Sequence, residues 1–198
     1  MRKSLLFVIA FLLISFSSIH AYSTDPQKFV KELIDDVITK LSDKTLPENN
    51  KIEFIEKIAS ENVDINALGL YTLGEIRKST NKNDLIRFQK IFKKYFLKTL
   101  SSRLNDYSST IFEVEGAEQK SSNYTIVNSK IIPTDGKPII KIDWRIYTKN
   151  PDKPLIRDLI VEGLSLARTQ KEEFASVIES NNGDVKKLFI ALQKFIDK

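Results

Sequence analysis

Apolar side chains recur at helical spacing over the first half of the chain and again near its end. Between residues 26 and 107 they repeat every three or four positions, which predicts amphipathic helices. Two more helices are predicted after residue 169, where the same spacing returns. The six predicted helices begin, in chain order, at Pro26, Pro47, Asp64, Asp84, Gln170 and directly after the capping residue Asp184.

The predicted fourth helix, from Asp84 to about Tyr107, carries two lines of side chains. One line is aromatic and apolar, and it contains Phe88, Phe92, Phe96 and Leu100. The other line is basic, and it contains Arg87, Lys90, Lys94 and Lys98. Most such basic lines are solvated helix faces. The alternative is a docking edge for acidic partners or lipid head groups.

From residue 110 the apolar spacing changes to every second position, which predicts strands. On the third strand Ile142 and Trp144 share one face, while charged residues take the other. The pair Asp135-Gly136 predicts a hairpin turn between the second and third strands. The four predicted strands are Ile111–Val114, Tyr124–Ile132, Ile139–Tyr147 and Leu155–Val161. Helices, then an antiparallel meander, then helices indicate an α+β fold with helices packed on the sheet.

The last predicted strand passes into the fifth helix through an apolar corner. Gly163 breaks the strand, and Leu164 and Leu166 follow it at once. Thr169 and Glu172 have the spacing of a capping box, which predicts that the helix begins there. Because turns usually lie in water, apolar residues at this corner indicate either a covered turn or a hollow that they line.

The first 21 residues have the pattern of a signal peptide. Arg2 and Lys3 precede an apolar run from Leu5 to Ile14, and Ala21 ends an acceptable cleavage site. An uncleaved anchor is the alternative, although the apolar run is shorter than the roughly 18 residues of a membrane span. We therefore expect an exported chain, with residues 22–198 forming a single domain.

Composition excludes several classes of chemistry. The chain has no Cys, and its single Met and single His both lie within residues 1–21, so the mature chain would lack all three. It would thus lack the commonest general base, metal ligand and thiol nucleophile, and we predict no metal site and no cofactor. Without Arg2 and Lys3 the Lys plus Arg count falls from 31 to 29 against 26 Asp plus Glu, so the net charge falls from +5 to +3. This mild charge does not indicate a nucleic-acid partner.

The polar residues of the corner are candidates for catalysis, but a structural role explains them more simply. Asp158 and Glu162 are expected to hold the corner by binding backbone N–H groups or Arg168, and Ser165 to stabilise the turn. Ser165 lacks the second Gly of a nucleophile elbow and a His to activate it, although a Ser–Lys pair stays open. We therefore predict no catalytic residues. The open alternatives are a small exported hydrolase and a ligand-free interaction module.

Two blocks of sequence resemble the MlaC family of soluble periplasmic phospholipid carriers. One is Asp158-x-x-Val161-Glu162-Gly163-Leu164-Ser165-Leu166, and the other is Tyr71-Thr-Leu-Gly74 with the Phe88-x-x-x-Phe92 pair after it. The resemblance implies helices around a curved four-stranded antiparallel sheet, with an apolar cavity for acyl chains. It also implies two partners, an outer-membrane lipoprotein complex and an inner-membrane ABC transporter complex. We expect a monomeric carrier.

The same resemblance gives a candidate lipid-binding pocket. It implies that Leu164 faces the pocket and that Leu159 and Val161 lead into it along the last strand. The apolar pattern adds further wall candidates, which are Leu68, Tyr71, Phe88, Phe92, Ile142 and Trp144. Periodicity alone cannot distinguish a filled core from a hollow one.

Overall fold

The computed structural model describes residues 22–104, 110–134 and 136–198. The predicted signal peptide, residues 1–21, lies outside the described residues, and so does Asp135 of the predicted hairpin turn. Among the helices of the described ranges, none has the length and apolar character that crossing a membrane requires.

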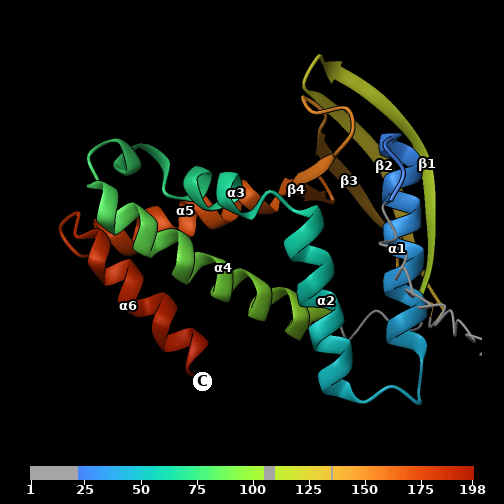
Figure 1. The fold of residues 1–198 in the computed structure, drawn as a ribbon, viewed down its shortest axis with the longest axis horizontal. Coiled ribbons are helices and arrows are strands. Elements are labelled where there is room, and N and C mark those ends of the chain that lie inside the picture. The colour runs from blue at the N-terminus through green and yellow to red at the C-terminus, as the bar shows by residue number, and fades with distance from the viewer. Residues whose placement is uncertain (1–21, 105–109, 135) are drawn as a thin grey trace, which may run out of the picture.

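The described residues form an α+β fold, as the sequence predicts (Figure 1). Its helices are α1 (Pro26–Ser42), α2 (Glu48–Asn62), α3 (Ile65–Thr72), the short 3₁₀ helix η1 (Gly74–Lys78), α4 (Lys82–Leu104), α5 (Leu166–Glu179) and α6 (Val185–Ile196). Its strands are β1 (Thr110–Ser121), β2 (Tyr124–Pro133), β3 (Ile140–Tyr147), β4 (Leu155–Val161) and β5 (Leu164–Ser165).

Local capping signals fix the starts of several helices. The Asp25 carboxylate accepts a hydrogen bond from the Lys28 N–H at 2.9 Å, and Pro26 occupies the first turn of α1. Asp64 caps α3 in the same way, by accepting from the Ala67 N–H at 3.1 Å. Gly74 has a φ of 61° and stands between α3 and η1, where the sequence predicts an end or a kink.

The sheet is antiparallel throughout, with its strands in chain order from β1 to β5. The prediction of four strands was wrong, because the two residues after Gly163 pair with the end of β4 as β5. Strand β1 is also much longer than the predicted Ile111–Val114. Its second half is polar and lacks an alternating pattern, yet it pairs with β2 beyond a bulge between Val114 and Gly116.

Helix α5 begins four residues before its predicted start at Gln170. The Ser165 hydroxyl accepts a hydrogen bond from the Arg168 N–H at 3.0 Å and thereby caps the helix. The Thr169 hydroxyl instead donates to the Ser165 carbonyl at 3.1 Å, inside the first turn. Two potential capping residues lie four positions apart here, and the earlier one caps the helix because β5 brings it there.

The buried apolar residues form two separate cores. The sheet core joins α1 and part of α2 to the inner face of the sheet, and it includes Phe29, Val30, Ile55, Val127, Trp144 and Ile146. The helical core joins α3, α4, α5 and α6, and it includes Ile65, Phe88, Phe92, Phe174, Leu188 and Phe189. Figure 1 shows α1 beside the curved sheet, α3 to α6 on the opposite side, and α2 between them.

Candidate functional site

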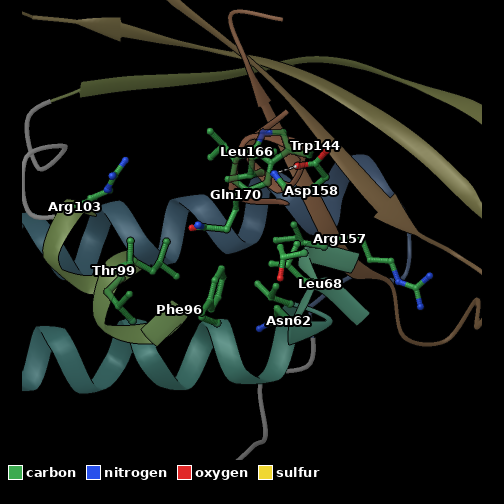
Figure 2. Close-up of a pocket in the computed structure, with 18 of the residues that line it drawn as sticks. Asn62, Leu68, Phe96, Thr99, Arg103, Trp144, Arg157, Asp158, Leu166 and Gln170 are labelled. Atoms are coloured by element: carbon green, nitrogen blue, oxygen red, sulfur yellow. Dashed lines mark hydrogen bonds between the residues drawn. The ribbon is translucent and has the colours of Figure 1, made fainter. Parts of the chain in front are cut away.

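An apolar cavity of about 330 Å³ lies between the two cores (Figure 2). This volume is at the lower end of the range of roughly 300–1,000 Å³ typical of small-molecule pockets. Side chains from α1, α2, α3, α4, β3, β4 and α5 line it. The lining is mainly aliphatic and aromatic, and it includes Leu33, Ile58, Leu68, Phe96, Leu100 and Leu159.

Four of the lining residues are exposed to solvent and mark the rim of the cavity. They are Arg103 at the end of α4 and Leu166, Thr169 and Glu173 on the first turns of α5. The remaining lining residues are buried or half-buried. The cavity therefore has an apolar interior and a rim that carries one positive and one negative side chain.

The structure brings four of the nine predicted pocket residues to the cavity. Leu68, Phe92, Trp144 and Leu159 line it. Phe88 is buried in the helical core and Ile142 in the sheet core, so each fills a core instead of facing the cavity. Tyr71 is exposed on α3, and Val161 packs at the edge of the sheet core.

Leu164 lies outside the cavity lining, with 68% of its surface exposed. The reason is the turn before it, in which Glu162 and Gly163 have φ angles of 49° and 82°. Two consecutive positive φ values are the pattern of a type I′ turn, which reverses the chain tightly and pairs Leu164 with Val161 at the end of the sheet. Leu166, two positions later, lies at the cavity instead.

Polar side chains hold the corner between β4 and α5. The buried Asp158 carboxylate accepts hydrogen bonds from the Ser165 hydroxyl at 2.6 Å and the Ala167 N–H at 3.0 Å. Arg145 stands 3.7 Å from the same carboxylate. Glu162 accepts a hydrogen bond from the Lys141 N–H. Because the Ser165 hydroxyl donates to Asp158 and also caps α5, the contacts of this corner are structural.

A second polar cluster fixes α3 against the sheet. The Arg157 guanidinium donates to Asp64 at 2.7 and 2.9 Å and to the Tyr124 hydroxyl at 2.8 Å, and it lies 3.4 Å above the Tyr147 ring. The neighbouring backbone makes a parallel bridge between Val63 and Ile156. These contacts position the α2–α3 junction, which forms one side of the cavity.

At the rim, hydrogen bonds connect α4 to α5. The Tyr95 hydroxyl donates to the Gln170 side-chain oxygen at 2.9 Å, and the Gln170 amide donates to Glu173 at 2.8 Å. Burial raises the pKa of Tyr95 above its usual range. The phenol is therefore a neutral donor at neutral pH.

The basic line on α4 is divided by the structure. Arg87 lies over the Phe189 ring, with 5.7 Å between its guanidinium carbon and the ring centroid, and Lys98 donates to the Ile196 carbonyl at 2.7 Å. Lys90 and Lys94 are exposed. Two of the four cations therefore bind α6, which leaves two for any docking edge.

Sequence reasoning missed much of the α4 wall. Tyr95, Phe96, Thr99, Leu100 and Arg103 all line the cavity. Phe96 and Leu100 continue the line that starts with Phe88 and Phe92, and this continuation is the signal that could have identified them. Within the described ranges, no cluster of His, Cys, Asp and Glu side chains is suited to hold a metal ion.

Comparisons with known proteins agree on the family. A structure of a phospholipid-binding protein from Ralstonia solanacearum in complex with a phospholipid has a TM-score of 0.71 and 20% sequence identity, covering 87% of this chain and 98% of that chain. At this identity the likeness shows the fold. No curated protein matches the sequence significantly. The sequence model of the MlaC protein matches residues 31–194. Since this match spans most of the chain, the protein belongs to the MlaC family.

Proposed function

We propose that this protein binds a phospholipid and holds the acyl chains in the cavity between its two cores. The observation that carries this proposal is the apolar cavity itself, whose interior is built from side chains such as Phe96, Leu100 and Leu159. The Ralstonia protein, which has the same fold and was solved with a phospholipid, supports it.

The energetics of lipid transfer explain why such a cavity is useful. Each methylene removed from water contributes about 0.8 kcal/mol, so two acyl chains with roughly thirty methylenes contribute on the order of 25 kcal/mol. A carrier must replace this apolar environment while it leaves the charged head group at the rim. Binding of this kind requires no catalytic residue, metal or cofactor, and we propose a binding protein instead of an enzyme.

We further propose that the protein carries phospholipid across the periplasm between the two membranes. Its partners would be an outer-membrane lipoprotein complex and an inner-membrane ABC transporter complex, as the MlaC resemblance implies. The signal-peptide pattern of residues 1–21 supports export, and residues 22–198 would then act as a monomeric carrier domain.

Native mass spectrometry of the purified protein tests lipid binding. We expect a bound mass of several hundred daltons that extraction identifies as phospholipid. In Leu100→Glu, a carboxylate would enter the apolar wall, and we expect most of the bound lipid to be lost because a charge is costly to bury there.

Leu164→Glu is the matched control, because it makes the same substitution at an exposed leucine outside the lining. It should retain the lipid content of the wild type. Circular dichroism would confirm that both variants are folded. Wild-type protein that carries no lipid and takes none from vesicles would contradict the proposal, as would normal lipid content in folded Leu100→Glu.

A further inference from the structure

Two opposite charges stand at the cavity rim without neutralising each other. Arg103 lies in the last turn of α4, and Glu173 lies on α5; both are exposed and both line the cavity. Neither forms an ion pair with a residue in the described ranges. Figure 2 shows Arg103 at one edge of the group of labelled lining side chains.

Both charges act on the same group, the Tyr95 hydroxyl. Burial is the main cause that raises the pKa of Tyr95, and Glu173 raises it further while Arg103 lowers it. The two charges thus lie within electrostatic reach of one hydroxyl, on either side of the rim. Because Tyr95 is hydrogen-bonded to Gln170, and Gln170 to Glu173, the two helices are held together at this point.

Thr99 lies on the cavity wall one helical turn before Arg103. Its hydroxyl is buried beside the Tyr95 phenol but makes no hydrogen bond of good geometry with a described residue. A buried hydroxyl without a partner is unfavourable, so the empty cavity presents an unused donor. The α4 wall therefore presents, in order, apolar side chains, a free hydroxyl and a free cation.

This order matches the chemical order of a diacyl phospholipid, which runs from acyl chain to ester carbonyl to phosphate. The fourth group of the rim, Glu173, extends the match to a positive group beyond the phosphate. A primary ammonium suits Glu173 better than a quaternary one, because only the primary ammonium can donate hydrogen bonds to a carboxylate.

We propose that the rim is a head-group site for a zwitterionic phospholipid with a primary amine. Arg103 binds the phosphate, Thr99 donates to an ester carbonyl, and Glu173 binds the ammonium. This inference rests on the proposed function, since the acyl chains must occupy the cavity for the head group to reach the rim.

A simpler role for Arg103 is to stabilise α4, because a cation in the last turn interacts favourably with the helix dipole. That role predicts that an Arg103 variant loses stability and binds every lipid equally less well. A head-group role predicts instead a loss that depends on the lipid.

The test uses delipidated protein of residues 22–198 and three lipids with identical acyl chains, which are diacylglycerol, phosphatidic acid and phosphatidylethanolamine. We expect the wild type to bind phosphatidylethanolamine most tightly. Arg103→Ala should weaken binding of both phosphate-containing lipids by roughly three- to tenfold and leave diacylglycerol unchanged. Glu173→Gln should weaken only phosphatidylethanolamine, by roughly two- to fivefold.

Lys94→Ala is the matched control, because it removes an exposed cation of α4 that does not line the cavity, and it should change none of the three affinities. Glycerophosphoethanolamine, which has the head group without acyl chains, should not bind measurably; affinity comparable to that of the lipid would overturn the assignment to a lipid head group.

An equal loss for all three lipids in Arg103→Ala, or no loss for phosphatidic acid, would overturn the head-group site while leaving lipid binding intact. Wild-type protein that binds none of the three, diacylglycerol included, would instead contradict the proposed function.

Discussion

Helix α4 carries one apolar line along its length, yet its two halves meet different surroundings. In the first half, Phe88 is 0% and Phe92 2% exposed, and their rings pack on Phe174 and Phe189 with centroid distances of 5.8 to 6.4 Å. In the second half, Phe96 and its neighbours one turn on line the cavity. Phe92 contacts both environments and marks the boundary.

The difference comes from what lies opposite the helix. Side chains of α5 and α6 cover the first half of α4, while the second half faces α2 and the sheet across the cavity. Spacing along a helix determines which residues share a face, but only the opposite element determines whether that face is filled.

The largest expected effect comes from Phe88→Ala in the filled half. Removing a fully buried ring should lower the free energy of unfolding by about 3–5 kcal/mol, because the transfer and cavity contributions both apply. Urea unfolding followed by circular dichroism measures this change. A loss below about 1 kcal/mol would contradict a filled first half, since it would mean that the site collapses freely.

Gly69→Ala tests the boundary between the halves. A Cβ at Gly69 would lie 2.8 Å from Cδ1 of Phe92, whose ring is held by Phe88, Phe96 and Phe174. Although alanine favours a helix by about 1 kcal/mol over glycine, we expect a net loss of about 1–3 kcal/mol from overpacking. The control is Gly116→Ala, where a Cβ meets no atom within 4 Å. Equal effects for the two variants in urea unfolding would exclude a tight boundary.

Phe96→Ala in the hollow half should cost less than Phe88→Ala, about 1–2 kcal/mol by the same measurement. One side of the Phe96 ring already faces the cavity, so fewer contacts are lost and no new void is enclosed. If the two phenylalanine variants lost equal stability, the contrast between the halves would be wrong.

The smallest effect concerns the ionisation of Tyr95 at high pH. Burial raises its pKa in the folded state above the usual value of about 10, so the stabilisation is complete below that pH and is lost as the pH rises through the folded pKa. Lipid in the cavity should raise this pKa further by excluding water. The phenolate absorbance of wild type minus Tyr95→Phe, with and without lipid, measures the shift.

Tyr22 provides the internal control for that titration. Its pKa is also raised, first by burial and then by its hydrogen bond to Asp36, but it does not line the cavity. Its ionisation should therefore be the same with and without lipid. A lipid-dependent shift in Tyr22, or none in Tyr95, would place the lipid elsewhere.

The parts of the fold that were predictable have local signals. Strand β4 was predicted at Leu155–Val161 as found, and the caps Asp25 and Asp64 gave the starts of α1 and α3. Strand β5 could not be predicted, because two residues carry no periodicity. The start of α5 was misplaced because Ser165 and Thr169 are both suitable caps, and only the pairing of β5 with β4 selects Ser165.

The cavity itself was beyond the sequence pattern. Leu68, Phe92, Trp144 and Leu159 were assigned to the pocket, but Phe88 and Ile142, which have equivalent positions in their own patterns, fill the cores. The separation between two cores depends on contacts between distant elements, which no local window contains. The position of Arg103 at the rim has the same origin.

The two-residue turn at Glu162-Gly163 has a consequence for how this sequence can change in length. Since β4 and β5 leave no spare residue between them, one inserted amino acid would reverse the orientation of every following side chain in β5. Leu164 and Leu166 would then exchange places with Ser165, and the Asp158 carboxylate would lose the hydroxyl it binds. Substitutions are tolerable at this corner, but insertions and deletions are not.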